Sequence, residues 1–492
     1  MALSTSRKLM LTKAIVFVVG GTFLLFLLQL YSSDQPMQMF SLQISPMQEQ
    51  MELYSEEESV SEASPAFQGD LTRRVDFKGT NATLWDKTYP RQECNPRLFP
   101  TGHWTGLKFK TPDNSSQEST NHTGQQLYGS IAAQHAIWSH QHPKNCSDKK
   151  FIAYEALGPE HGIGTILHHL GVALQAAIDL DRILVLYPQP NYEWVNGWFC
   201  TDTSALDECY FEPLSSCTIA DAFGDREPNL DNLWRYSELS LESYHCDESD
   251  PKFSERLLGT SLKEVMKTFD TPTITQHLRS ETPHMFHTLL KAGNISENSF
   301  YWWRAQSIAY IVRPNARLLN ELKNRRNYFY ILAPLEPGTI SVHIPYSHHL
   351  KDQRTASNEA YLQSAESLVS RYPNDLQRRI FLTTEDPDAI SFFSKLTNWN
   401  VSWTNVTRIP RNEEITDPNA VLNNFASRFG WDEEFINSFL NLDVALECDG
   451  FVGQLSSHWN RLIDELRSTV RCKYDRAFVD VVQGFNISNY FW

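Results

Sequence analysis

This sequence has few basic residues relative to acidic ones, and its cysteines lack the close spacing of a zinc site. Its 492 residues include 43 Lys and Arg against 59 Asp and Glu, which gives a formal net charge of −16. A general nucleic-acid-binding protein needs a basic face to neutralise phosphates, so this charge argues against that class. None of the eight cysteines has the Cys-x-x-Cys spacing of a structural zinc site, and we therefore expect no metal.

One long apolar run stands near the N-terminus. Residues 14–31 carry no charge, and Arg7, Lys8 and Lys13 precede them. As a helix this run would span roughly 27 Å, about the hydrocarbon thickness of an early secretory membrane. Because the basic residues lie on its N-terminal side, we expect a type II signal anchor whose short tail is cytoplasmic. A cleaved signal peptide is the alternative.

Two counts support a lumenal location for the rest of the chain. Asn-x-Ser/Thr sites occur at Asn81, Asn114, Asn121, Asn145, Asn294, Asn400, Asn405 and Asn486. The cysteines are even in number, which suits disulfides in an oxidising compartment: Cys94, Cys146, Cys200, Cys209, Cys217, Cys246, Cys448 and Cys472. Their pairing cannot be chosen from the sequence. We expect a glycosylated, disulfide-bonded protein of the secretory pathway.

The composition changes along the chain from a polar stem to an α/β pattern. Residues 32 to about 90 are rich in Ser, Gln, Met and Glu and show neither apolar periodicity nor heptads, which predicts a flexible stem. Residues 110–125 are expected to form an exposed loop. The predicted divisions are a cytoplasmic tail (1–13), a transmembrane anchor (14–31), a stem (32–93), an N-terminal α/β lobe (94–335) and a C-terminal Rossmann-like lobe (336–492).

Strand and helix patterns alternate from residue 151 onward. Strands at 151–157 and 182–187 flank a helix that starts after Gly162, which predicts a right-handed parallel crossover. A helical region at 299–324 is expected to break near Pro314. The second half continues with strands at 339–344, 378–384 and 442–453 and helices at 358–372 and 457–470. Two α/β lobes of this kind form a ligand cleft at the carboxyl ends of their strands.

The glycine-containing turn GIG at 162–164 opens the first of these helices. Glycines between a strand and a helix let backbone N–H groups approach a phosphate, where the helix dipole adds a favourable field. The third glycine of a dinucleotide fingerprint is missing, since Leu167 stands there. A purely structural turn is therefore an equal alternative for this stretch alone.

Two later strands also end in groups that suit a nucleotide. Glu385 and Asp386 follow an apolar strand and could accept hydrogen bonds from ribose or base, with a helix N-cap role for Asp386 as the alternative. Ser456 and Ser457 open a helix after a buried strand, where hydroxyl and N–H groups suit a pyrophosphate. Arg461 follows one turn later and could reach a phosphate or pair with an acidic neighbour.

A cluster of titratable residues follows the strand at 339–344. A general base or a phosphate ligand could come from this cluster, which contains His343, His348, His349, Lys351, Asp352 and Arg354. Neighbouring histidines are more often surface residues, which is the alternative for His348.

Four motifs in this order resemble those of the α-1,6-fucosyltransferase family and its wider superfamily. They are GIGTILHH (162–169), YWWRAQSIAYIVRP (301–314), IFLTTEDP (380–387) and LDVALECDGFVGQLSSHWNR (442–461). The resemblance covers about 320 residues. It implies a GT-B-like fold of two Rossmann-type lobes, a GDP-fucose donor, metal-independent inverting transfer to a glycan or glycoprotein, no cofactor, and a Golgi type II membrane protein.

The resemblance also implies roles for individual residues. Gly162 and Gly164 would lie near the donor phosphates, and Ser456 and Ser457 would hold the pyrophosphate. The remaining nucleotide contacts would come from His343, Asp443, Glu385 and Asp386.

One position departs from the family. Its strand carries an Arg that stabilises the β-phosphate, and here Pro345 stands in that place. Losing such a donor costs roughly 10²–10³ in rate by analogy with oxyanion-hole deletions. Lys351, Arg354 or a protonated His348 or His349 could substitute, and Asp352 is the expected base. The alternatives are the same fold with another nucleotide sugar, or an inactive membrane-anchored glycan-binding relative.

Overall fold

The computed structural model describes the parts of the chain on which the rest of this section draws. They are residues 83–84, 91–93, 125–158, 161–189, 192–195, 197–201, 203, 205–225, 234–235, 282–295, 299–332, 334–345, 356–406, 426 and 428–482. Within them no helix is both long and apolar enough to span a membrane. The predicted anchor at 14–31, the predicted loop at 110–125 except for Gln125, which begins β3, and most of the stem lie outside the described residues.

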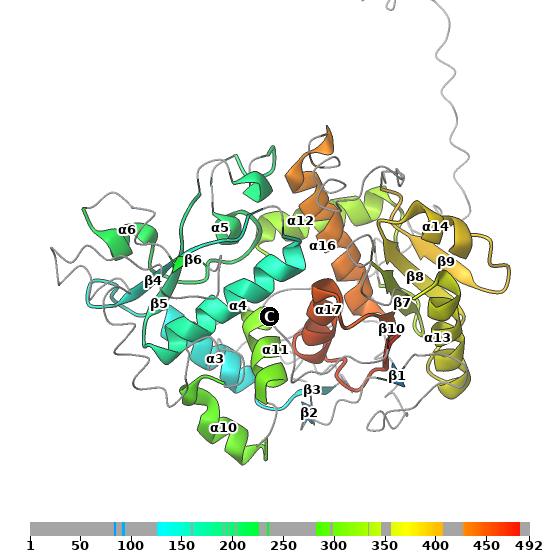
Figure 1. The fold of residues 1–492 in the computed structure, drawn as a ribbon, viewed down its shortest axis with the longest axis horizontal. Helices are drawn as coiled ribbons and strands as arrows, with labels where there is room; N and C mark the ends of the chain where they lie inside the picture. Colours follow the sequence, from blue (N-terminus) through cyan, green and yellow to red (C-terminus); the bar gives the residue numbers. More distant parts are fainter. Residues whose placement is uncertain are drawn as a thin grey trace, which may run out of the picture. The chain divides into compact units, whose positions relative to one another are not determined.

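A six-stranded sheet organises the C-terminal half (Figure 1). Its order is β9-β8-β7-β10-β11-β1, and all neighbours are parallel except the antiparallel pair β11–β1. The strands are β1 (Thr83–Leu84), β7 (Ile340–Ile344), β8 (Arg379–Thr384), β9 (Asn400–Trp403), β10 (Gly450–Gly453) and β11 (Phe478–Asp480). The helices of this half are α13 (Asn358–Arg371), α14 (Pro387–Phe393), α16 (Trp431–Glu447) and α17 (His458–Ser468).

Both faces of this sheet are buried, as parallel sheets require. Alternate residues such as Val342, Leu382 and Val452 pack with α13 in one core, while Phe381 and Phe451 pack on the opposite face. Because both faces are buried, apolar residues stand at consecutive positions in β8 (380–382) and β10 (451–452).

A smaller parallel sheet, in the order β5-β4-β6, organises the N-terminal half. Its strands are β4 (Phe151–Glu155), β5 (Ile183–Leu186) and β6 (Trp234–Arg235), and a separate pair is formed by β2 (Arg91–Glu93) and β3 (Gln125–Leu127). The helices are α3 (Ser130–Gln141), α4 (Ile163–Asp179), η1 (Glu193–Val195), α5 (Leu206–Tyr210), α6 (Ile219–Phe223), η4 (His284–Phe286), α10 (His287–Ala292), α11 (Ser299–Ile311) and α12 (Ala316–Tyr328).

Most predicted elements of both halves are confirmed. The crossover β4–α4–β5 is parallel, and β7, α13, β8 and α17 lie where they were expected. The helical region at 299–324 breaks between α11 and α12, where Pro314 precedes the N-cap residue Asn315. The α/β class with parallel sheets is therefore confirmed.

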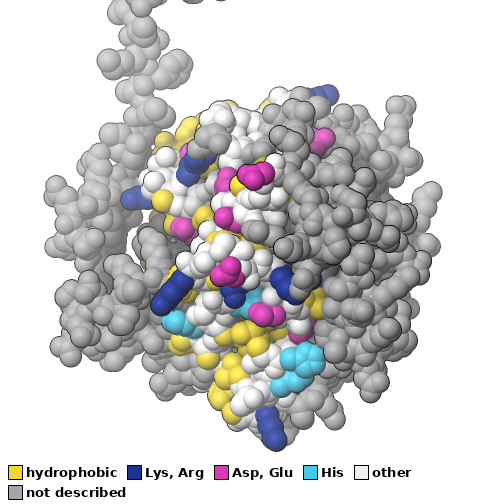
Figure 2. Space-filling view, turned by 90° about the vertical axis from the view of Figure 1, so that its left-hand side faces the viewer, with side chains coloured by type: hydrophobic (Ala, Val, Ile, Leu, Met, Phe, Trp, Pro, Cys, Tyr) yellow, Lys and Arg dark blue, Asp and Glu magenta, His cyan; other side chains and the backbone are white. Residues whose placement is uncertain are grey.

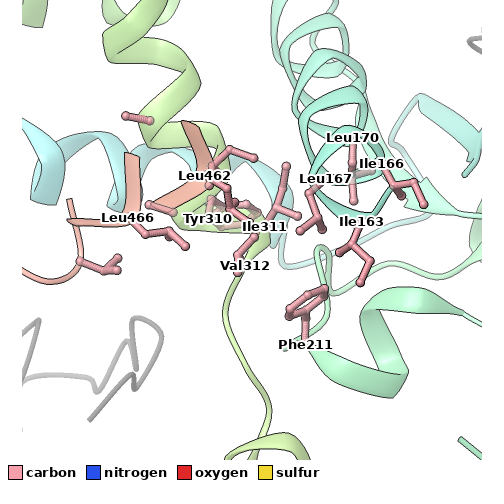
Figure 3. Close-up of a cluster of buried hydrophobic side chains, with 14 of the residues drawn as sticks. Ile163, Ile166, Leu167, Leu170, Phe211, Tyr310, Ile311, Val312, Leu462 and Leu466 are labelled. Carbon is pink, nitrogen blue, oxygen red and sulfur yellow. The ribbon is translucent and has the colours of Figure 1, made fainter. Parts of the chain in front are cut away.

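The two sheets share one hydrophobic core. Residues Ala63–Trp492 form a single compact unit, and the predicted division into two lobes at residue 335 stays a prediction. Helices α4 and α11 of the N-terminal half pack against α17 of the C-terminal half. Figure 3 shows side chains of this junction, among them Leu167, Ile311 and Leu462, all completely buried.

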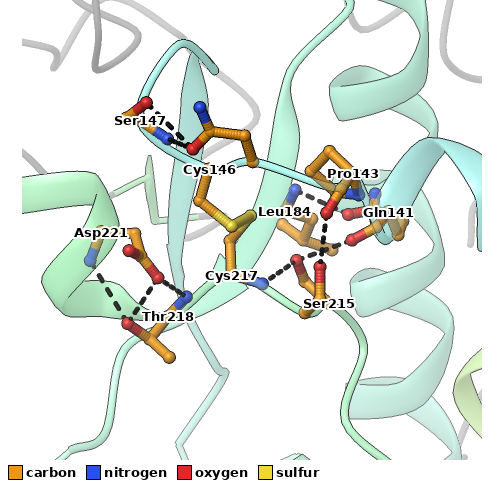
Figure 4. The surroundings of a disulfide bond; sticks show 11 residues. Gln141, Pro143, Cys146, Ser147, Leu184, Ser215, Cys217, Thr218 and Asp221 are labelled. Carbon is orange, nitrogen blue, oxygen red and sulfur yellow. Dashed lines mark hydrogen bonds between the residues drawn. A yellow bond between two sulfur atoms is a disulfide. The ribbon is translucent and has the colours of Figure 1, made fainter.

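Two disulfides lie in the N-terminal half, Cys146–Cys217 and Cys200–Cys209. The first ties the segment before β4 to the segment before α6, and Ser215 and Thr218 next to it hold the same turn by hydrogen bonds (Figure 4). Cys472 is also disulfide-bonded. Cys448 is a free, buried thiol, so the expectation from the even count does not extend to every cysteine.

Two sequence predictions about boundaries are wrong. Strands β1 and β2 belong to sheets although they precede residue 94, so folded structure begins inside the predicted stem. The predicted strand at 442–453 contains the last turns of α16 and only four strand residues, 450–453. Its apolar run joins the buried face of a helix to a buried strand, and periodicity over so few residues does not separate the two.

Candidate functional site

The N-termini of α4 and α17 meet face to face. A Cβ placed on Gly164, in the first turn of α4, would lie 3.0 Å from the backbone nitrogen of Trp459 and 3.1 Å from the carbonyl carbon of His458 in the first turn of α17. A side chain at residue 164 would require the backbone of α17 to shift, so glycine permits this close approach. The glycine turn and the serine turn that the sequence singled out are thus neighbours across the junction of the two halves.

Each of these helices follows a strand at the topological switch point of its own sheet. In the larger sheet the chain leaves β7 toward β8 and β9 on one side, and β10 and β11 lie on the other. In the smaller sheet β4 lies between β5 and β6. Ligands of open α/β sheets bind outside the carboxyl ends of strands at such points. Helix α4 follows β4, and α17 follows β10. Because the first turns of these two helices are in contact, the two switch points adjoin.

Among the residues that the structure describes, no side chain caps either of these helix N-termini. Gly162, the N-cap of α4, has no side chain to accept a hydrogen bond, and Ser457, the N-cap of α17, makes no capping hydrogen bond. Neither helix has an acidic residue in its first turn. By contrast, α13 is capped by Ser357 and has Glu359 in its first turn. Two uncapped N-termini present free N–H groups and the positive ends of two dipoles, an arrangement suited to an anion.

The two glycines of this turn have different tasks. Gly164 is buried against α17, whereas Gly162 is exposed and a Cβ on it would meet no atom within 4 Å. The backbone at Gly162 is extended, with φ −65° and ψ 152°, which any residue adopts. Gly162 therefore faces the space where a ligand could approach, and Gly164 holds the two helices together.

Valine at each glycine tests this division. Gly164→Val should lower the free energy of unfolding by about 1–3 kcal/mol, because the added methyl groups collide with the backbone of α17. Gly162→Val should change it by less than about 0.5 kcal/mol. Urea unfolding of the two variants measures both values. Equal losses, or none at residue 164, would contradict the close packing of α4 and α17.

A buried polar network joins α4, α11 and α17 at the junction. His168 of α4 has Nε2 2.9 Å from a carboxylate oxygen of Glu465 on α17 and Nδ1 2.6 Å from the carbonyl oxygen of Gly164. The other carboxylate oxygen of Glu465 accepts a hydrogen bond from Nε of Arg304 on α11. All three side chains are at most 1% exposed. The network therefore links three helices to the carbonyl of the glycine turn.

Charge in this network follows from burial and pairing. Burial alone would raise the pKa of Glu465, but the Arg304 guanidinium and His168 hold it below its ordinary value, so Glu465 is ionised. Burial lowers the pKa of His168, and the Glu465 carboxylate opposes that shift. Burial and the Arg461 guanidinium also lower the pKa of His458, whose Nδ1 lies 3.3 Å from Nδ1 of His168.

A second polar contact joins α11 to α17 one turn away. The hydroxyl of Tyr301 donates to a carboxylate oxygen of Asp464 at 2.6 Å and lies 3.1 Å from the hydroxyl of Ser468. Burial raises the pKa of Tyr301 well above its ordinary value, so the phenol stays a donor. The position of α17 relative to α11 is thus set by directional bonds as well as by apolar packing.

His343 lies at the carboxyl end of β7, beside the switch point. It is 6% exposed, and its Nδ1 lies 2.8 Å from the hydroxyl of Thr383 on β8. Burial lowers the pKa of His343 to about 3. The side chain is therefore a neutral hydrogen-bonding group and cannot supply positive charge to a phosphate. Pro345, two residues on, has neither an N–H nor a charge.

The residues predicted after β10 lie at the junction. Ser456 is exposed and Ser457 half-buried at the start of α17. Arg461 is buried, with Nη1 donating to the carbonyl of Leu455 at 3.2 Å, so its guanidinium holds the turn that carries the two serines.

Asp443 has a different setting from the one implied by the resemblance. It lies on α16 rather than on a strand, and its carboxylate oxygens pair with Arg471 at 2.6 Å and Arg326 at 3.3 Å. Both guanidiniums are largely buried. A nucleotide contact from Asp443 remains a prediction, while these two ion pairs already give the residue a structural task.

The two acidic residues after β8, Glu385 and Asp386, have different settings. Asp386 is the N-cap of α14, and its carboxylate accepts a hydrogen bond from the N–H of Asp388 at 2.9 Å, which was the alternative for this residue. Glu385 is exposed directly after β8. Of the two carboxylates, Glu385 is the one presented toward solvent.

The three predicted catalytic residues cannot be placed. His348, Lys351 and Asp352 lie outside the described residues, which stop at 345 and resume at 356. No group of three or more potential metal ligands occurs in the part of the chain that the structure describes. On the face drawn in Figure 2, Lys and Arg side chains are scattered among acidic and apolar ones.

The polar network was not foreseen from the sequence, although one pattern could have indicated it. Every residue of α17 from Asn460 onward is buried, including Arg461, Asp464, Glu465 and Arg467. A helix that is polar in sequence yet enters a core must find partners for its charges. Such a helix is itself an indication of a constructed polar site.

Comparison with known proteins gives structural likeness only. The sequence matches no family model, and no curated protein is significantly similar to it. The α-1,6-fucosyltransferase NodZ, soaked with GDP-fucose, is 14% identical over 65% of this chain and 93% of its own, with a TM-score of 0.33; a NodZ structure of the same kind comes from Bradyrhizobium. POFUT1 in complex with GDP is 13% identical over 68% of this chain and 98% of its own, with a TM-score of 0.37.

A plant structure shows the same level of likeness. A variant of Arabidopsis thaliana FUT1 in complex with GDP is 8% identical over 68% of this chain and 72% of its own, with a TM-score of 0.34. The overlap is partial, so the function of this chain has to be argued from its own residues.

Proposed function

We propose that this protein is a glycosyltransferase that binds a nucleotide sugar where the N-termini of α4 and α17 meet. One observation carries the proposal: two helix N-termini without side-chain caps, each at the switch point of a parallel sheet, are in contact, since a Cβ on Gly164 of α4 would lie 3.0 Å from the backbone nitrogen of Trp459 in α17. A nucleoside diphosphate is the leaving group of such a transfer, and free N–H groups with aligned dipoles stabilise the charge that develops on it.

The motif resemblance assigns the donor as GDP-fucose. The pyrophosphate would contact the backbone near Gly162 and the hydroxyls of Ser456 and Ser457, with Glu385 accepting hydrogen bonds from the base. Because the helix N-termini carry the positive field, transfer needs no metal ion. Inversion at the sugar requires a base on the acceptor side, for which the segment 346–355 offers Asp352.

The setting of the reaction follows from the sequence. The apolar run at 14–31 would anchor the protein in the Golgi membrane with its catalytic part in the lumen. The four sequon asparagines that the structure describes, Asn145, Asn294, Asn400 and Asn405, are all exposed, as glycosylated positions must be. The acceptor is a glycan or a glycoprotein.

Pro345 favours a second candidate function. A chain that lacks the phosphate-binding Arg at this place, and whose neighbouring His343 is neutral, has less positive charge around the β-phosphate than the family pattern supplies. Such a protein could retain nucleotide or glycan binding without turnover. Use of another nucleotide sugar is a variant of the first proposal.

Ligand-induced stabilisation distinguishes these functions. The full-length chain in mild detergent is unfolded thermally with GDP, UDP, GDP-fucose or UDP sugars present. Binding stabilises the protein by RT ln(1 + [L]/Kd), about 2.7 kcal/mol at a hundredfold excess over Kd. Stabilisation by GDP and release of GDP in the presence of glycan acceptors support the transferase, and stabilisation without turnover supports the binding protein. No response to any nucleotide contradicts the transferase and also a relative that retains nucleotide binding.

A substitution at Gly162 separates phosphate binding from folding. Gly162→Asp supplies the missing cap of α4, and should leave the free energy of unfolding unchanged or raise it by up to about 1 kcal/mol. The same carboxylate would occupy the place expected for the donor phosphate, so GDP affinity should fall at least tenfold. Gly162→Ala, which adds no charge, is the matched control and should keep most of the affinity. Unchanged GDP binding in Gly162→Asp would place the phosphates elsewhere.

A further inference from the structure

Among the described residues, the outer edge of β9 has no neighbouring strand, charge or proline to protect it. β9 is the last strand of the six-stranded sheet and pairs with β8, and among the described residues no strand lies on its other side. An edge strand presents unpaired N–H and C=O groups that can pair with another chain. Proteins blunt such edges with charged residues, proline or bulges. Residues 400–406, NVSWTNV, contain no charge and no proline and are rich in residues that favour strands.

The same short segment carries two of the eight Asn-x-Ser/Thr sites. Asn400 and Ser402 are exposed, while Val401 and Trp403 between and after them pack on the core. The whole acceptor site Asn400-Val401-Ser402 therefore lies on the edge strand with its asparagine facing solvent. Asn405, also exposed, begins the second site just beyond the end of β9.

A glycosylation site also coincides with the strand at the opposite edge of the sheet. The strand at that edge is β1, and the sequon Asn81-Ala82-Thr83 ends within it. Three of the eight sites thus adjoin the two outermost strands of one sheet. Carbohydrate on an asparagine is bulky and strongly hydrated, so a glycan next to an edge strand blocks the approach of a second backbone.

We propose that Asn400 and Asn405 carry N-linked glycans that cover the edge of β9 and prevent this sheet from pairing with the sheet of a second copy. The carbohydrate takes the place of the charged or proline residues that the edge lacks. This role is independent of nucleotide binding.

The first measurement is occupancy. The full-length chain is produced in a secretory host, purified in mild detergent and digested, and the peptide containing residues 400–406 is weighed before and after treatment with an N-glycosidase. We expect the glycosidase to convert Asn400 and Asn405 to aspartate, with loss of the carbohydrate mass. An unmodified peptide would overturn the proposal.

The second measurement is self-association, with matched variants at one position. In an Asn405→Gln background, Ser402→Ala and Ser402→Lys both remove the Asn400 site, but only the lysine restores a charge to the edge. The apparent mass of the alanine variant in sedimentation should rise with protein concentration. At high concentration it should reach at least twice the mass of the parent protein. The lysine variant should sediment as the parent does.

Two controls make the result specific. Asn145→Gln removes a glycan from an exposed position that is not on a strand, and it should leave the sedimenting mass unchanged apart from the lost carbohydrate. The thermal transition of each variant shows that it is folded. Association of the Asn145 variant, association of the lysine variant, or a monodisperse alanine variant would each contradict a shielding role. None of these outcomes depends on whether GDP binds.

Discussion

Replacing Glu465 by glutamine is expected to lower the free energy of unfolding by about 3–5 kcal/mol. The substitution removes the carboxylate that faces both the Arg304 guanidinium and His168 where all three are buried. Breaking one side of a buried ion pair leaves the other charge in a medium of low polarity, which costs far more than the pair itself contributes. Urea unfolding at pH 7 measures the loss.

Two comparisons test the cause of that loss. Glu336→Gln breaks a pair with Arg379 that is half exposed, and it should cost less than about 1 kcal/mol. The double variant Arg304→Met, Glu465→Leu removes both charges, and it should be more stable than the sum of the two single variants implies. Additive losses would show that Arg304 and Glu465 do not interact.

Acidification from pH 7 to pH 5 should cost the protein about 3 kcal/mol of stability, much of it through histidines near the junction. Burial lowers the pKa of His343 to about 3, and burial together with His168 and His161 lowers the pKa of His169 to about 3. In the unfolded chain both titrate near 6.5. Below pH 6.5 these histidines are protonated in the unfolded state but not in the folded state. Each of them therefore lowers the free energy of unfolding by about 2 kcal/mol by pH 5.

One buried carboxyl acts in the opposite direction. Burial raises the pKa of Asp207 to about 6, so between pH 7 and 5 the folded state takes up a proton before the unfolded state does. Protonation of Asp207 therefore raises the free energy of unfolding by about 1 kcal/mol over the same pH interval. His343→Gln should therefore flatten the pH dependence by about 2 kcal/mol, while Asp207→Asn should steepen it. Urea unfolding of each variant at both pH values measures these slopes, and identical slopes in all three proteins would contradict the assignment.

The strands and helices that position the site could largely be predicted from the sequence. Apolar strands bounded by turns at 151–155, 340–344 and 379–384, and the helix after Gly162, follow from local periodicity. The turn chemistry at 162–164 and 456–457 also identified the two loops that meet. Their meeting was inferred through the order of motifs, since neither loop is distinctive on its own.

What could not be predicted depends on distant contacts. The partners His168, Arg304 and Glu465 are separated by more than 130 residues each, and no local pattern connects them. Strand β1 has two residues and acquires its structure only by pairing with β11. Residues 442–447 continue a helix because α16 packs against the sheet, where their apolar run alone suited a strand equally well.

The shared core has a consequence for how this chain can have diversified. In many two-lobed proteins a half can be exchanged for another, since few contacts cross the boundary. Here α17 belongs to the C-terminal half, yet the partners of its charged groups, Arg304 and His168, lie in the other. A transplanted half would bring an ionised Glu465 without its cation, so new acceptor specificity is more readily acquired by altering loops than by exchanging halves.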